Sequence, residues 1–182
     1  MTFDTARVRK RGRPPRLNRD EALDAATDLI REGGFTATSM EEILSAMKIS
    51  RSSFYQAFGS KEALLLAVLE RYSRRGLADL RNMAASNAQD PLRTIVFELA
   101  KFDDPRGCLI VNCMVELSGR NADIAALLRD HNAQVIAILT PLLGGDEARA
   151  NAILATCYGA TTMRKVGMPL ATIRTILERI IA

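Results

Sequence analysis

The chain lacks the residue clusters that most disulfide frameworks and metal sites require. Its 182 residues include three cysteines and one histidine, and no two cysteines form a CxxC pair. Cys108 and Cys113 are five positions apart, so on a helix they would point about 140° away from each other. This usage is typical of a reducing cytoplasm, and we expect no disulfide, no metal site and no cofactor.

Long apolar runs and strand-like patterns are also missing. The longest apolar run covers residues 63–69, whereas a membrane-spanning helix needs roughly 20 residues. The first basic cluster leads to no apolar stretch of the kind found in a secretory signal. Val, Ile and aromatic residues never alternate between paired turns. We therefore expect a cytoplasmic, all-α protein with no membrane partner.

Positive charge is concentrated at the N-terminus. The chain is 48% hydrophobic and 25% charged with a net charge of +4, which is ordinary for a globular protein. Residues 1–19 contain seven basic residues and one acidic residue, so they carry +6 and the remainder carries −2. This distribution is typical of a nucleic-acid binder, although a solvated tail has the same composition. We predict a flexible basic arm over residues 1–17, in which Arg11 and Arg13 contact DNA.

Helical periodicity and its end signals divide the chain into about nine helices. Asn18 and Ser39 each precede a Glu by three positions, as in a capping box, and Ser50 is a further N-cap. The glycines at 33–34 end the first helix, and Gly76 is a weak point in the long fourth one. The predicted helices cover about 18–33, 39–47, 51–58, 61–84, 92–102, 108–117, 122–143, 147–166 and 170–182.

The second and third helices are short and joined by a tight turn, as in a helix-turn-helix. In that motif the second helix enters the major groove of DNA and the first crosses the backbone. Phe54 and Phe58 are four positions apart and anchor one side of the helix to the core. On its polar side, Arg51 suits a guanine edge or a phosphate, and Gln56 suits adenine.

Other side chains extend this predicted interface. Tyr55 suits a phosphate contact, and Lys61 begins the next helix, where free backbone N–H groups favour an anion. The DNA contacts predicted outside the arm are Thr38, Ser39, Lys48, Ser50, Arg51, Ser52, Ser53, Tyr55, Gln56 and Lys61.

Four segments contain uncommon residue choices in one order and at fixed spacing. They are GF at 34–35, TSMEEI at 38–43, ISRSSFYQAF at 49–58 and SKEAL at 60–64. Residues 18–70 thereby resemble the DNA-binding domain of the TetR/AcrR family of repressors. Two positions depart from the family pattern. Lys48 stands where the family often has Gly, which predicts a modestly strained left-handed backbone, and Ala57 replaces a frequent aromatic or His.

The resemblance implies the organisation of the whole chain. It implies a helix-turn-helix domain at 18–64 and a ligand-binding and dimerisation domain at 65–182, with the helix at 61–84 linking the two. It further implies a homodimer formed largely by the last two helices, a palindromic operator, and release from DNA by a small-molecule inducer. The segment RGCLIVN at 106–112 is similar to one that opens the sixth helix in one branch of the family.

The predicted inducer site lies among the middle helices. Plain core or surface is the alternative interpretation for each of its residues, and His131 in particular could be solvated near the middle of its helix. The predicted lining is Phe97, Phe102, Met114, Leu128 and Val135, with Asn112, Asn121 and His131 as polar options.

Cys108 has two interpretations. It begins the helix at 108–117, where the helix dipole and the nearby Arg106 favour a reactive thiolate, so it could sense an electrophile or an oxidant. Alternatively it is a small buried residue, which is the interpretation we prefer for Cys113 and Cys157.

An enzyme and a helical interaction module are the two alternatives to a repressor. An enzyme would need an activated nucleophile or paired carboxylates in a cleft. Cys108 with His131 is the only candidate dyad, and no Gly-rich phosphate loop accompanies it. A helical interaction module without DNA binding is the second alternative. We predict that the chain is a repressor and not an enzyme.

Overall fold

The computed structural model describes residues 18–86, 89–117, 119 and 121–182, so the predicted arm with Arg11 and Arg13 lies outside the described residues. Within these ranges the regular structure is entirely α-helical, which confirms the predicted fold class. The helices are α1 (Arg19–Gly33), α2 (Met40–Met47), α3 (Arg51–Phe58), α4 (Lys61–Ala85), α5 (Pro91–Leu99), α6 (Leu109–Leu117), α7 (Ala122–Leu142), α8 (Glu147–Lys165) and α9 (Leu170–Ile181).

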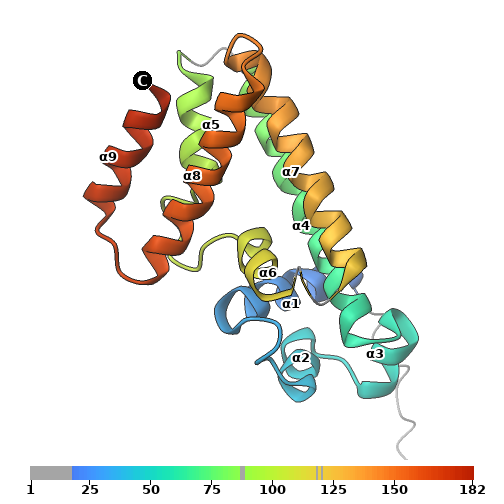
Figure 1. Cartoon of the computed structure of the whole chain (residues 1–182). Coiled ribbons are helices and arrows are strands. Elements are labelled where there is room, and N and C mark those ends of the chain that lie inside the picture. The colour runs from blue at the N-terminus through green and yellow to red at the C-terminus, as the bar shows by residue number, and fades with distance from the viewer. Residues whose placement is uncertain (1–17, 87–88, 118, 120) are drawn as a thin grey trace, which may run out of the picture.

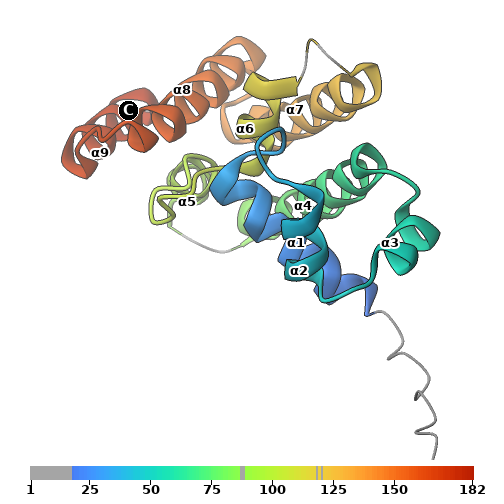
Figure 2. The same ribbon diagram turned by 90° about the horizontal axis from the view of Figure 1, so that it is seen from below.

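The helices are arranged around the long α4. Figure 1 shows α4 and α7 lying along each other, with α5 and α8 beside them, α9 packed on α8 and α5, and α1 to α3 gathered at the start of α4. Seen from below, α1 lies between α2 and α4, while α3 projects to one side (Figure 2). Among the described residues, every helix is too short or too polar to cross a membrane.

Side-chain caps fix the starts of the first four helices. The Asn18 side chain accepts hydrogen bonds from the backbone at the start of α1. Ser39 and Glu42 form a complete capping box on α2. Ser50 caps α3 by accepting from the backbone N–H of Ser53, and Ser60 caps α4 in the same way. Each cap satisfies N–H groups that an isolated helix leaves unpaired, so the sequence signals for these helix starts are confirmed.

One helix end differs from the sequence prediction by more than one residue. α5 ends at Leu99, three residues early, because Lys101 adopts a left-handed backbone conformation with φ 47. A helix cannot continue through that conformation. α7 ends at Leu142, one residue before the predicted end and one residue past Pro141. Pro141 removes a single backbone hydrogen bond from the last turn, where little helix remains to be disrupted.

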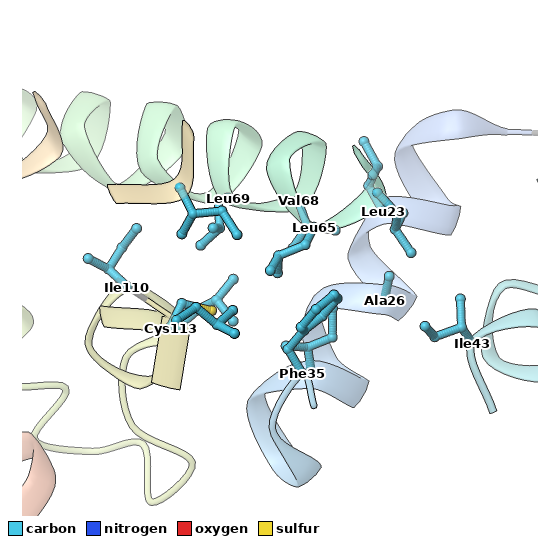
Figure 3. Packing of buried hydrophobic residues seen from close by; sticks show 14 of the residues in the cluster. Leu23, Ala26, Phe35, Ile43, Leu65, Val68, Leu69, Ile110 and Cys113 are labelled. Atoms are coloured by element: carbon cyan, nitrogen blue, oxygen red, sulfur yellow. The ribbon is translucent and has the colours of Figure 1, made fainter. Parts of the chain in front are cut away.

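Buried apolar side chains form two clusters. The first, called the head core here, joins α1, α2 and α3 to the first half of α4, to α6 and to the start of α7. Figure 3 shows Leu65 and Leu69 of α4 facing Ile110 of α6 and Phe35. The second, called the body core, joins the second half of α4 to α5, α7, α8 and α9. Tyr158 of α8 packs against both clusters.

Candidate nucleic-acid interface and inner chamber

The helix α3 has one side in the head core and the other in solvent. Phe54 is fully buried and Phe58 nearly so, with their ring centroids 5.6 Å apart. Arg51, Tyr55 and Gln56 are exposed, as is Ser52, and Tyr55 keeps 48% of its surface in solvent. The structure thus anchors α3 rigidly and presents its polar side chains together, as the sequence pattern predicts.

The turn before α3 has the backbone expected at Lys48. Its φ is 55 and its ψ is 41, which is the left-handed region, and its N–H donates to the carbonyls of Leu44 and Ser45. This region is uncommon for a residue with a side chain. Ile49 packs against the head core immediately afterwards, and the exposed Ser50 begins α3. The left-handed residue therefore sets the angle between α2 and α3.

Arg51 is paired within the protein. Its guanidinium lies 2.5 Å from a carboxylate oxygen of Glu41, and both side chains are mostly exposed. Exposed ion pairs of this kind contribute about 0–1 kcal/mol. Arg51 can therefore exchange Glu41 for a base edge or a phosphate at little cost.

Two predicted contact residues have other partners. Thr38 is buried, and its hydroxyl donates to the carbonyl of Gly34 over 2.6 Å. The Lys61 ammonium donates to the carbonyl of Phe35 over 2.8 Å and lies 4.4 Å from the centroid of that ring. Both side chains hold the turn between α1 and α2, whereas the exposed Ser39 caps α2 as described above.

The far end of α6 is joined to the same turn. The Glu116 carboxylate accepts hydrogen bonds from the backbone N–H groups of Phe35 and Thr36, over 3.1 and 2.6 Å. Burial raises the pKa of Glu116, but these bonds outweigh burial and leave the pKa below its usual value. No sequence signal connected residues about 80 positions apart, so this contact was missed.

The segment before α6 is joined to α1 by a buried arginine. Arg31 is 7% exposed, and its guanidinium donates to the carbonyl of Gly107 and, over 2.7 Å, to Asp104. Arg106 also pairs with Asp104 and reaches Asp28 of α1 over 2.8 Å. The hydrogen bonds from Arg106, followed by those from Arg31, hold the pKa of Asp104 well below its usual range. Movement of this segment would therefore be transmitted directly to α1.

A small cavity, the inner chamber, lies where the head core meets the body core. Its volume is about 30 Å³. Two of its lining residues, Cys108 and His131, are candidates for the predicted inducer site, and the fold brings them to the same space. The full lining is Tyr72, Gly76, Leu80, Glu98, Leu99, Lys101, Cys108, His131 and Tyr158.

The other predicted inducer-site residues lie elsewhere. Phe97 and Phe102 line an open groove of about 820 Å³ on the outer side of α5. Met114 and Leu128 pack in or against the head core, and Val135 belongs to the body core. The Asn112 side chain accepts a hydrogen bond from Lys165, and Asn121 caps α7.

His131 is buried, which excludes the alternative interpretation of a solvated ring. It is 6% exposed, and its Nδ1 lies 2.8 Å from the hydroxyl of Ser73. Loss of hydration on burial lowers the pKa of His131 to about 4, so the ring is neutral at pH 7. Burial also raises the pKa values of Tyr72 and Tyr158. These three rings therefore line the chamber as uncharged groups.

The three cysteines have different surroundings. Cys108 immediately precedes α6, and its sulfur lies on the chamber wall 3.9 Å from the hydroxyl of Tyr72. Cys113 and Cys157 are buried in the two cores, which confirms the sequence interpretation, and burial raises the pKa of each to about 12. No group of His, Cys, Asp or Glu among the described residues is arranged to hold a metal ion.

Comparison with known proteins agrees with this architecture. Residues 22–68 match the family described as bacterial regulatory proteins, tetR family. The transcriptional repressor ComR of Escherichia coli is 33% identical over 156 residues, which cover 81% of this chain and 74% of that protein. The chain belongs to the TetR family. The repressor NemR of Escherichia coli is 28% identical over 147 residues, covering 76% of this chain and 72% of that protein.

Solved structures of TetR-family regulators have the same fold. A CifR cysteine mutant, in complex with 26-base-pair operator DNA, superposes with a TM-score of 0.78 over 92% of this chain and 97% of its own, at 24% identity. The reduced form of Escherichia coli NemR gives a TM-score of 0.76 over 89% of this chain and 94% of its own, at 23% identity. The relatives of this TetR-family protein are DNA-binding transcriptional regulators rather than enzymes.

Proposed function

We propose that the protein is a homodimeric repressor that binds a palindromic operator through α3 and is released by a small molecule or a reactive electrophile. The observation that carries this proposal is the polar, exposed side of α3, fixed in place by the buried Phe54 and Phe58. A helix of this kind fits the major groove. A twofold dimer would place two copies about 34 Å apart, one turn of DNA.

Mutation of the exposed α3 residues tests operator binding. Arg51→Ala should weaken binding to an upstream palindromic site about tenfold to a hundredfold, because one base or phosphate contact is lost. Gln56→Ala should relax the sequence preference. Arg74→Ala is the matched control, since it removes the same charge from an exposed site about 20 Å along α4. Gel shifts between about 50 and 200 mM salt measure both changes. Equal losses for Arg51→Ala and Arg74→Ala would contradict the proposal.

The exposed sides of α8 and α9 support the proposed dimer. Small residues at four exposed positions, Ala148, Ala152, Ala155 and Gly159, alternate four and three apart along α8. They fall on one side of the helix and would allow a second helix to approach closely. Leu170, at the start of α9, is 40% exposed. An obligate interface of this kind buries about 2,000 Å² or more.

A charge placed on this surface tests the dimer. Ala155→Glu should convert the protein to monomers in sedimentation experiments, because it introduces two facing carboxylates into an apolar contact. Ala126→Glu, at an exposed position on α7, is the control and should remain dimeric. If Ala155→Glu remained dimeric, this side of α8 would not be part of the dimer interface.

The inner chamber supports the proposed response to electrophiles. Cys108 lines the chamber and directly follows Gly107, whose carbonyl accepts hydrogen bonds from Arg31 of α1. If the sulfur of Cys108 adds to a ring carbon of a quinone, a thioether forms and the thiol proton passes to the quinone oxygen. The added group is far larger than the chamber, so the 103–107 segment has to move and would draw α1 with it.

Replacement of the thiol tests this response. Quinone or hypochlorite should release the wild-type protein from operator DNA, and Cys108→Ser should bind the operator normally and resist release. Cys113→Ser, in the head core, is the control and should respond as the wild type does. If quinone or hypochlorite released Cys108→Ser from operator DNA as readily as the wild type, Cys108 would not be the sensor.

A further inference from the structure

The inner chamber is separated from a second hollow by a thin wall. This outer hollow lies between α1 and α4, has a volume of about 330 Å³, and has exposed side chains such as that of Arg75 at its rim. The residues that line both spaces are Tyr72, Gly76, Glu98 and Lys101. The wall is therefore formed by two adjacent turns of α4 and by an ion pair at the end of α5.

Gly76 leaves this wall without a side chain at its centre. A glycine inside a helix costs about 1 kcal/mol relative to alanine, yet a β-carbon at Gly76 would meet no atom within 4 Å. Its φ is also outside the left-handed region that favours glycine. Neither close packing nor backbone conformation requires glycine here. What the missing side chain provides is open space between the two hollows.

An ion pair completes the wall beside Gly76. The ammonium of Lys101 contacts the carboxylate of Glu98, and both side chains are partly exposed. Such a pair contributes about 0–1 kcal/mol, so side-chain motion opens it readily. Beyond it, Tyr72, His131 and Tyr158 present no charge, and Lys101 is neutralised by Glu98. An anion entering the chamber would lose its hydration without gaining a free cation.

We propose that Gly76 and the Lys101–Glu98 pair form the passage through which a small, uncharged molecule reaches Cys108 from the outer hollow. The chamber volume of about 30 Å³ matches roughly one water molecule in the liquid. A water-sized molecule therefore fits without rearrangement, and any larger molecule enters only as the wall opens. The passage serves the sensor role proposed above and rests on it for its regulatory meaning, but access can be measured without DNA.

Alkylation of Cys108 measures that access. The full-length protein is treated with iodoacetamide, which is neutral, or with iodoacetate, which has similar size and carries a negative charge. Mass spectrometry of peptides gives the rate at Cys108, normalised to the rate for each reagent in urea. Labelling of Cys157, buried in the body core, serves as the internal reference for unfolding. We expect iodoacetamide to label Cys108 at least about tenfold faster than iodoacetate after normalisation.

Filling the passage should block the neutral reagent. Gly76→Leu places a side chain in the open space and should lower iodoacetamide labelling of Cys108 at least about tenfold. Ala78→Leu, at an exposed position two residues further along α4, is the matched control and should label as the wild type does. Gly76→Ala should have an intermediate rate. Lys101→Ala, which opens the ion pair, should label faster while Cys157 stays unlabelled.

Two results would overturn the passage. One is wild-type labelling of Cys108 in Gly76→Leu, and the other is parallel labelling of Cys108 and Cys157, which indicates access by unfolding. A gel shift on the alkylated protein then separates this proposal from the sensor. If Gly76→Leu blocks labelling but alkylated wild-type protein still binds operator DNA, the passage stands and the sensor role fails.

Discussion

The helices around the head core and those around the body core are held in place by different contacts. In the head, side chains cap the starts of α1 to α4, and Arg31, Glu116 and Lys61 tie the turns to neighbouring helices. In the body, side chains also cap α5, α7 and α8, but α9 begins without a side-chain cap, and Met163, Val166 and Leu170 remain exposed. The contacts of the head hold α3 in one orientation, whereas the body has exposed apolar surface that the proposed second subunit would cover.

The largest expected effect comes from emptying the head core. Phe54→Ala should lower the free energy of unfolding by about 3–5 kcal/mol, because it leaves a cavity beneath α3, and operator binding should be lost with it. Tyr55→Ala is the control on the exposed side and should change unfolding by less than about 1 kcal/mol. Urea denaturation followed by circular dichroism measures both. Similar losses for the two variants would mean that α3 is not anchored as described.

Arg31→Ala tests the connection between the head and the segment before Cys108. We expect a loss of about 2–4 kcal/mol, because the carbonyl of Gly107 and the carboxylate of Asp104 lose a buried partner. Arg75→Ala breaks an exposed pair with Asp24 and should cost less than about 1 kcal/mol. Denaturation curves compare the two variants. If both cost equally little, α1 and α6 are not coupled through Arg31.

The neutral His131 predicts how stability depends on pH at the junction of the two cores. Its pKa is about 4 in the folded protein against 6.5 for the free side chain, so the unfolded chain binds the proton more tightly. Stability is complete above pH 6.5 and is lost as the pH falls towards 4, by about 2 kcal/mol at pH 5.

His131→Gln removes the only histidine in the chain and should flatten this dependence between pH 7 and 5. Urea denaturation of both proteins at the two values is the measurement. Wild-type stability that does not change over this range would show that His131 is hydrated in solution.

The smallest effect concerns the strained turn of the head. Lys48→Gly should raise the free energy of unfolding by up to about 1 kcal/mol, because glycine adopts the left-handed conformation freely. The same change removes a positive charge beside α3, so operator affinity should fall while stability rises. Lys48→Ala removes the charge but keeps a β-carbon in the left-handed conformation, so it separates charge from strain. If both variants bound the operator as tightly as the wild type, Lys48 would not contact the DNA.

Sequence reasoning succeeded where the signal is local. The caps at Asn18, Ser39 and Ser50, the left-handed residue at Lys48 and the polar side of α3 each depend on neighbours within a few positions. The predicted lining of the inducer site stays a prediction. Phe97, Leu128 and Val135 are candidates in the sequence, but residue type alone cannot tell a cavity wall from ordinary core.

The sequence by itself determined the helices, most of their starts, the polar side of α3 and the membership of the TetR family, because these features are specified by short segments of chain. The tertiary structure alone decided that Arg31 meets Gly107, that Glu116 holds the α1–α2 turn and that Cys108 shares a chamber with His131. These contacts join residues up to about 80 positions apart. Their partners depend on how whole helices pack, and no local pattern of residue types encodes that arrangement.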